Sequence, residues 1–315
     1  MLKEKNIPAP DLEEARAINK RLRAEKVPDV TTPAGRIEMR TDAIDASKAP
    51  ESLTPQDVII PGPGPGGDLR LHVLRPPGDV RAVMVNIHGG GWVIGLPEQD
   101  DRINELTVNM CGVATVSVDY RLAPENAYPA QLEDCLAAVE WLLEHAETEF
   151  GTDRLVIAGS SAGGHLAAMT LLHLRDELRA IDRVVAASLV FGVYDVSLSI
   201  AARLATPDTP VLTAQYLQGT AETVFPIGLK SWHSPRFSPL YADLAGLPPA
   251  LFTVGSLDPL LDDSLFMSER WKAAGNDAEL DIWPEAPHKF FGKVPPVGKH
   301  AQARINSWLN ARLDA

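Results

Sequence analysis

Short, mostly apolar runs alternate with amphipathic stretches along most of the chain from residue 57 onward. Runs such as Ala82–Ile87 and Leu155–Ala158 have the length and composition of strands buried on both faces. Buried strands that alternate with helices indicate an α/β fold, with a mostly parallel sheet of about eight strands covered by helices on both faces. The predicted strands span 57–60, 69–74, 82–87, 113–118, 155–158, 184–191, 250–254 and 280–283, and the predicted helices span 102–111, 131–148, 162–174, 264–274 and 298–313.

The first two predicted strands, 57–60 and 69–74, differ from the later ones. Residues 69–74 alternate between apolar and polar side chains, which is typical of an antiparallel pair at the edge of a sheet. The connection 61–67 reads PGPGPGG, a sequence in which neither a helix nor a strand can continue. We therefore expect an antiparallel pair of strands joined by this loop.

Two segments break the alternation of strands and helices. Residues 10–26 carry apolar side chains at near-helical spacing and predict an amphipathic helix, whereas 27–54 predict loop and short helix. Residues 195–243 contain helical pieces and many Ser, Pro and Thr residues, but no strand pattern. We expect both segments to lie outside the sheet, as an N-terminal cap segment at 1–54 and a cap insertion at 195–243. The α/β domain then consists of 55–194 and 244–315.

Length and composition limit the function classes that remain. The 315 residues are enough for one large α/β domain with a cap. Hydrophobic residues make up 45% of the chain and charged residues 23%, which is ordinary for a globular protein. The formal net charge of −13 disfavours nucleic acid and anionic membranes as partners, because both would repel the protein.

Cysteine positions and hydropathy give no sign of a disulfide, a secretion signal or a membrane span. Cys111 and Cys135 each fall in an apolar helical stretch, which favours two buried thiols over a disulfide or a metal site. No early stretch combines a basic region with an apolar run, and no apolar run is long enough to span a membrane. A cytoplasmic protein without a membrane partner is therefore expected.

The junction between the predicted strand 155–158 and the helix after it contains Gly159, Ser161 and Gly163 in the pattern G-x-S-x-G. At such a junction the pattern is typical of a sharp turn that exposes a nucleophilic serine. Glycine is needed on either side because a Cβ would collide with the adjoining strand and helix. The turn also places the N–H of Ala162 at a helix N-terminus, where it can stabilise an anion. Taken alone, the pattern also fits an ordinary glycine-rich turn.

A second glycine-rich segment, His88-Gly89-Gly90-Gly91-Trp92, follows the predicted strand 82–87. Because its glycines carry no side chains, their N–H groups can be aimed at one point, as the stabilisation of an oxyanion requires. No Lys-Ser/Thr pair follows, which argues against a phosphate-binding P-loop. We expect His88 to orient this loop through a ring nitrogen rather than to act as a catalytic base.

Two further residues suited to catalysis follow predicted strands. Asp258 comes after the strand 250–254, and His288 comes after the strand 280–283. The chain order Ser161, Asp258, His288 is the order expected for a serine nucleophile on a strand-to-helix turn. Each residue also has an ordinary explanation, since Asp258 before a proline can form a turn. Three matched residues at three strand ends nevertheless favour a catalytic triad.

Together these motifs resemble the hormone-sensitive-lipase-like branch of the α/β-hydrolase esterases, also called bacterial family IV carboxylesterases. The resemblance covers about residues 57–315 and is carried by His88–Trp92, Asp119–Glu125, Tyr128–Ala130, Gly159–Gly164, Ser238–Leu240, Leu247–Ala250, and Asp258–Leu260 with Asp262. It implies an α/β-hydrolase fold with a helical cap, and hydrolysis of short- to medium-chain acyl esters through an acyl-enzyme.

The resemblance also implies roles for individual residues. Ser161 is expected to be the nucleophile, His288 the base and Asp258 its partner, and the remaining site residues are the oxyanion donors Gly90, Gly91 and Ala162. Such a mechanism needs no metal and no organic cofactor. The expected partner is a small-molecule ester, and the analogy also allows a homodimer.

Two residues depart from the family's pattern. Ser160 stands where Asp or Thr is usual, which would remove a local brace but no chemical role. Lys289 stands where a small residue is usual, and a cation there would oppose protonation of His288 if it points that way.

Two alternatives to an esterase remain open. One is a relative that cleaves amides such as aryl formamides, and the other is a non-catalytic small-molecule receptor.

Overall fold

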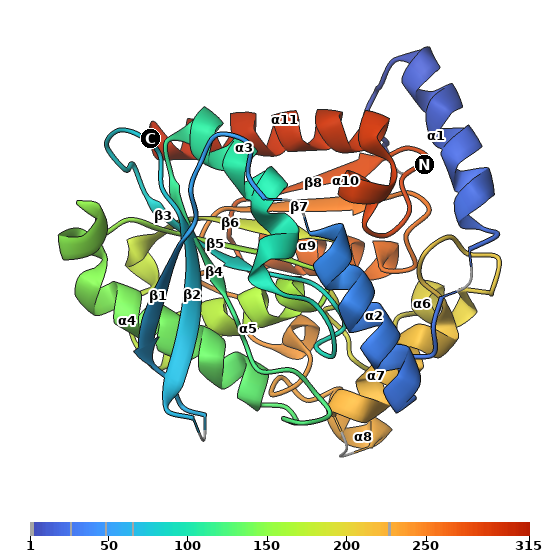
Figure 1. Cartoon of the computed structure of the whole chain (residues 1–315), viewed down its shortest axis with the longest axis horizontal. Helices are drawn as coiled ribbons and strands as arrows, with labels where there is room; N and C mark the ends of the chain where they lie inside the picture. The colour runs from blue at the N-terminus through green and yellow to red at the C-terminus, as the bar shows by residue number, and fades with distance from the viewer. Residues whose placement is uncertain (1–2, 26, 48, 65, 226–227) are drawn as a thin grey trace.

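The computed structural model describes residues 3–25, 27–47, 49–64, 66–225 and 228–315, and an eight-stranded sheet forms its centre (Figure 1). The strand order is β1-β2-β4-β3-β5-β6-β7-β8, in which β2 is antiparallel to β1 and β4, and the other neighbours are parallel. The predicted mostly parallel sheet is therefore confirmed. The strands are β1 (Gln56–Pro61), β2 (Asp68–Leu74), β3 (Val83–Ile87), β4 (Ala114–Val118), β5 (Leu155–Ser160), β6 (Val184–Val190), β7 (Ala250–Gly255) and β8 (Ala278–Trp283).

Helices cover both faces of the sheet. On one face lie α3 (Asp101–Cys111) and α11 (Pro295–Leu313), and on the other lie α4 (Ala130–Phe150), α5 (Ala162–Asp176) and α9 (Leu261–Ala273). Successive side chains of a strand point to opposite faces, so each central strand contributes to two cores. In β5, Val156 packs with Trp308 of α11, whereas Ile157 belongs to the core of α4, α5 and α9.

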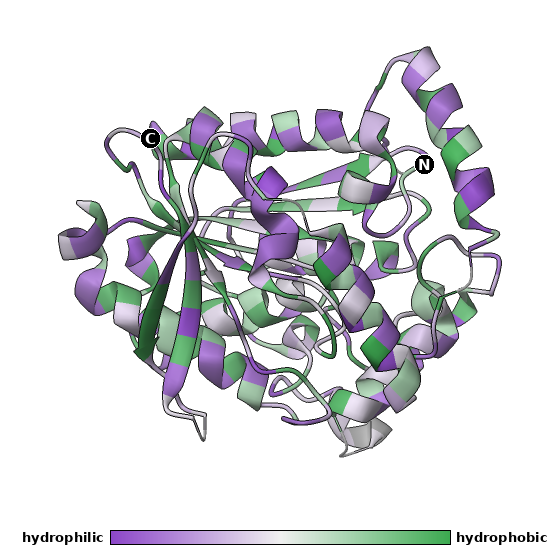
Figure 2. Ribbon diagram, viewed as in Figure 1, coloured by the Kyte–Doolittle hydropathy of each residue, from purple (hydrophilic) through white to green (hydrophobic). Residues whose placement is uncertain are grey.

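Helix α11 buries one side against the sheet, whereas α5 is buried at every residue from Ala162 to Leu172. Figure 2 shows polar and apolar residues alternating along α11, and the buried residues of this helix include Ile305, Leu309 and Leu313. Both cysteines are buried and free, as predicted, Cys111 in α3 and Cys135 in α4. In the described ranges, no helix is both long and apolar enough to cross a membrane.

The edge pair is antiparallel, as predicted. β1 and β2 pair in antiparallel fashion from Gln56 opposite Val73 to Pro61 opposite Asp68. The predicted loop between them includes Pro65, which lies outside the described residues. Toward the other edge of the sheet, Glu4 forms an isolated bridge with Ile282 of β8. The opening segment was expected to take no part in the sheet, and this single bridge corrects that expectation.

The N-terminal segment forms two helices of 14 residues, α1 (Ala9–Leu22) and α2 (Pro33–Ala46). The second helix is longer than predicted, because the hydroxyl of Thr32 accepts a hydrogen bond from the N–H of Gly35 and Pro33 starts the helix. Lys26, the predicted end of the first helix, lies outside the described residues. Helix α1 packs against α11. Helix α2 lies apart from α1, beside the insertion (Figure 1).

The insertion 195–243 contains no strand in its described part, as predicted. Its helices are α6 (Ile200–Leu204), α7 (Ala214–Val224), α8 (Leu229–Trp232) and a 3-10 turn, η3 (Pro239–Tyr241). Apolar residues of α7, such as Leu217 and Val224, belong to the same core as the sheet. The insertion is therefore packed onto the α/β domain.

Candidate active site

Ser161 lies in a strained turn between β5 and α5. Its φ is 57° and its ψ is −119°, a combination that non-glycine residues rarely adopt. Two neighbouring glycines make the turn sterically feasible. A Cβ on Gly159 would overlap the carbonyl oxygen of Gly163, and a Cβ on Gly163 would overlap the carbonyl oxygen of Ile87. The G-x-S-x-G pattern therefore allows the sharp turn at Ser161 that the sequence predicts.

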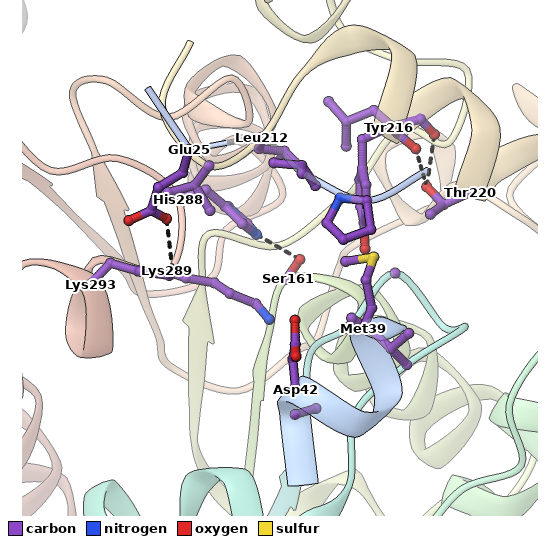
Figure 3. Close-up of a pocket in the computed structure, with 18 of the residues that line it drawn as sticks. Glu25, Met39, Asp42, Ser161, Leu212, Tyr216, Thr220, His288, Lys289 and Lys293 are labelled. Atoms are coloured by element: carbon purple, nitrogen blue, oxygen red, sulfur yellow. Dashed lines mark hydrogen bonds and ion pairs between the residues drawn. The ribbon is translucent and has the colours of Figure 1, made fainter. Parts of the chain in front are cut away.

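Ser161, His288 and Asp258 form one hydrogen-bonded chain. The Oγ of Ser161 lies 2.9 Å from Nε2 of His288, and Nδ1 of His288 lies 2.8 Å from Oδ2 of Asp258. The carboxylate can only accept, so the proton is on Nδ1, and Nε2 is free to accept the hydroxyl proton of Ser161. Figure 3 shows the imidazole of His288 pointing at Ser161.

The three residues come together because parallel strands end at the same edge of the sheet. Ser161 follows β5, Asp258 follows β7 and His288 follows β8. The N–H of Leu260 donates to the other carboxylate oxygen of Asp258 at 2.9 Å, which fixes the carboxylate in its turn. The relative exposures of the three residues are 7%, 4% and 2%, so their hydrogen bonds are shielded from bulk water.

The predicted oxyanion donors lie around Ser161. Gly90 and Gly91 have φ values of 131° and 58°, in the region that favours glycine, and both line a cavity together with Ser161 and His288. Ala162 is the first residue of α5 and is buried. Within the described part of the chain, the N–H groups of Gly90, Gly91 and Ala162 donate no hydrogen bond. All three are therefore available to a ligand oxygen.

His88 lies behind the glycine loop and does not line the cavity. Its Nδ1 donates to the carbonyl of Gly89 at 2.8 Å, and its ring stacks on Tyr120 at a centroid distance of 4.1 Å. Complete burial lowers the pKa of His88 to about 4, so the ring is neutral. That His88 orients the glycine loop stays a prediction.

The cavity above Ser161 has a volume of about 340 Å³. Its walls come from both predicted cap segments as well as from the α/β domain. Three aliphatic or aromatic residues of the insertion, Leu212, Tyr216 and Leu217, face the cavity. Phe225 and Trp232 do not. Phe225 packs against Trp92, Tyr128 and His165 of the α/β domain, and its carbonyl accepts a hydrogen bond from Nε1 of Trp232 at 3.0 Å.

Several cavity residues were not identified from the sequence. Met39 and Asp42 reach the cavity from α2, and Lys293 reaches it from α10 (Phe290–Lys293), a short helix that the hydrophobic pattern does not reveal. Their positions depend on how α2 and α10 are placed against the sheet. The length of α2 was the only sequence signal, since a full helix would have brought residues 39 and 42 onto one face.

Lys289 points into the cavity. The side chain is half-buried, and Figure 3 shows it extending toward the space between Ser161 and Asp42. Burial lowers the pKa of its ammonium group. Nowhere in the described ranges do three or more His, Cys, Asp or Glu side chains cluster so that they could hold a metal ion.

Comparisons with known proteins identify the family and the fold of the chain. Residues 84–292 match a family described by the alpha/beta hydrolase fold. The carboxylesterase NlhH of Mycobacterium tuberculosis is 33% identical over 316 residues, covering 98% of this chain and 91% of its own. A hyperthermophilic esterase from Pyrobaculum calidifontis superposes with a TM-score of 0.83 at 30% identity, over 95% of this chain and 98% of its own. The structure of EstE5 soaked with p-nitrophenyl butyrate superposes with a TM-score of 0.81 at 28% identity, over 96% of this chain and 99% of its own.

Proposed function

Because the chain belongs to the hormone-sensitive-lipase-like family of carboxylesterases with the α/β-hydrolase fold, we propose that Ser161 is its nucleophile. His288 is the general base, and Asp258 holds the imidazole in the tautomer that accepts the serine proton. The observation that carries this proposal is the continuous hydrogen-bonded chain from Asp258 through His288 to Ser161, at 2.8 and 2.9 Å.

Hydrolysis proceeds in two balanced half-reactions. The Oγ of Ser161 attacks the ester carbonyl carbon while Nε2 of His288 takes the hydroxyl proton. The tetrahedral oxyanion accepts hydrogen bonds from the N–H groups of Gly90, Gly91 and Ala162. The carbon–oxygen bond to the alcohol then breaks, and His288 returns the proton to the leaving oxygen. Water attacks the acyl-enzyme in the same way, which frees the acid and restores Ser161.

The segments 1–54 and 195–243 act as the cap that forms the substrate pocket. The support for this is that Met39 of α2 and Leu212, Tyr216 and Leu217 of the insertion line the cavity over Ser161. Its volume of about 340 Å³ is at the small end of ligand pockets, which span roughly 300–1,000 Å³. A pocket of this size favours short- to medium-chain acyl groups.

Substitution of the nucleophile tests the mechanism. Ser161→Ala is expected to abolish hydrolysis of p-nitrophenyl esters while circular dichroism shows an intact fold, because no other group can form the acyl-enzyme. The matched control is the neighbouring Ser160→Ala, which removes a hydroxyl one residue away and should keep most of the activity. Assays of the unaltered protein with acyl chains from C2 to C16 size the pocket.

Two results would count against this function. Activity of Ser161→Ala within tenfold of the unaltered protein would rule out the nucleophile. A rate maximum at C12 or longer would rule out the short- to medium-chain preference, even with the nucleophile correct.

A further inference from the structure

Lys289 occupies a backbone position that favours glycine. Its φ is 58° and its ψ is 27°, in the left-handed region where a Cβ is close to the backbone. It directly follows His288 and precedes the first residue of α10. Lysine at this position therefore carries a steric cost that glycine would not, and the side chain that causes the cost extends into the cavity above Ser161 (Figure 3).

The ammonium group of Lys289 has no partner that offsets its burial. It forms no hydrogen bond and no ion pair with any residue in the described ranges. The other cavity cation, Lys293, differs in this respect, because its ammonium group lies 3.3 Å from the carboxylate of Glu25. Lys289 is thus a partly desolvated cation that faces the space where a substrate binds.

The charged groups that face Lys289 leave its attraction for an anion largely in place. Asp42 lines the cavity from α2, but it is exposed to solvent and therefore strongly screened. The carboxylate of Asp100 attracts the ammonium group of Lys289, but it accepts its hydrogen bond from Asn86 at 3.1 Å and forms no ion pair with Lys289 within the described residues. The adjacent walls, including Met39 and Leu212, are apolar, so a charge bound at Lys289 would be poorly hydrated and strongly attracted.

We propose that Lys289 forms an anion subsite that selects ester substrates carrying a carboxylate close to the scissile bond. The subsite deepens the proposed esterase function and rests on it. The reaction itself is unchanged: Ser161 and His288 cleave the ester, and the ammonium group of Lys289 pairs with the substrate carboxylate. The steric and desolvation costs of the lysine are then offset when such a substrate is bound.

Paired substrates of similar shape and different charge test the subsite. Monoethyl glutarate and ethyl pentanoate differ by a carboxylate in the acyl part, and 4-acetoxybenzoate and 4-acetoxybenzamide differ by one in the alcohol part. The measured quantity is the ratio of kcat/KM for the charged ester to that for its neutral partner. The two pairs show on which side of the scissile bond the carboxylate is bound.

Variants of Lys289 give the expected changes in this ratio. In Lys289→Met the ratio for at least one pair should fall by at least about fivefold, because an ion pair in an apolar cavity is lost. Lys289→Gly should lower the ratio equally and should fold readily, because glycine relieves the backbone strain. Lys289→Arg keeps the charge and should retain most of the preference. The matched control is Lys272→Met, the same substitution at an exposed lysine of α9.

The pH and salt dependence add a second readout. The carboxylate preference should decrease as the pH rises through the lowered pKa of Lys289, because the ammonium group loses its proton there. It should also weaken at high ionic strength. A ratio that changes by less than fivefold in both Lys289→Met and Lys289→Gly, for both substrate pairs, would overturn the subsite. Failure of the esterase proposal is distinguishable, because Ser161→Ala would then still hydrolyse the neutral esters.

Discussion

At the scale of single residues, the chemistry of this protein depends on positions where a side chain is forbidden. Gly163 lies two residues after the strained Ser161, and an added Cβ would overlap the carbonyl oxygen of Ile87 and approach that of His88 to 2.6 Å. Both obstacles are backbone atoms of β3 and the glycine loop, which cannot move without displacing the oxyanion donors. The glycines of the serine turn thus position the nucleophile and the glycine loop relative to each other.

Gly163→Ala should therefore damage both stability and activity. We expect a loss of about 2–3 kcal/mol in the free energy of unfolding, because an overpacked site must shift backbone rather than a flexible side chain. Chemical denaturation and ester hydrolysis measure the two effects. Gly78→Ala is the matched control, since a Cβ at Gly78 meets nothing within 4 Å. Equal denaturation midpoints for the two variants would contradict this account of the turn.

At the scale of elements, one arginine attaches α2 to the rest of the molecule. Nε of Arg40 donates to the carbonyl of Val93 at 2.9 Å, and a guanidinium nitrogen donates to the carbonyl of Ala123 at 3.0 Å. The same side chain pairs with the carboxylate of Glu125 through two hydrogen bonds of 3.0 and 2.8 Å. Arg40 thus connects the helix that carries Met39 and Asp42 to the loops beside the oxyanion donors.

Arg40→Gln should loosen α2 without unfolding the α/β domain. We expect kcat/KM for esters to fall by about tenfold, because the lost hydrogen bonds to a charged group are each worth roughly 1.5–3 kcal/mol in holding the cavity wall. Hydrogen exchange across 33–46 should become faster. Arg36→Gln is the matched control, because Arg36 lies on the same helix but donates only to Val30 and Thr31 within the N-terminal segment. Equal effects of the two substitutions would show that α2 is not held through Arg40.

At the scale of the whole molecule, a buried histidine couples stability to pH. His72 of β2 hydrogen-bonds to Asp57 of β1 at 2.8 Å and to Asp101 of α3 at 3.0 Å. Burial opposes its protonation, but the hydrogen bonds to the two carboxylates outweigh burial and raise the pKa of His72. A raised pKa means that the folded state binds the proton more tightly than the unfolded chain does. The stabilisation is fully present below the unfolded pKa, near 6.5, and is lost as the pH rises through the folded value.

His72→Gln should reveal this contribution. The difference in unfolding free energy between the unaltered protein and the variant is expected to be largest near pH 5.5 and to shrink toward pH 9, measured by denaturation at several pH values. The comparison with the variant is needed because Asp263, whose pKa burial raises to about 7, also lowers stability as the pH rises. A difference that stays constant across this pH range would show that His72 is not charged in the folded protein.

Much of the fold and the core of the site could be predicted from the sequence. The eight strands and the helices between them follow from local hydrophobic periodicity, which is written in contiguous residues. The turn at Ser161 follows from a steric requirement that only its glycine neighbours satisfy. Because parallel strands end at one edge of the sheet, the order of Ser161, Asp258 and His288 was enough to predict that they meet.

The walls of the cavity were decided by the tertiary structure alone. Leu212 faces the substrate space and Trp232 does not, although both are large apolar residues of the same insertion. The direction of Lys289 depends on how the loop after β8 meets α2, and the attachment of that helix by Arg40 joins residues that are 53 to 85 positions apart. Local patterns specify elements and tight turns, whereas the contacts of a side chain depend on which distant segments fold against it.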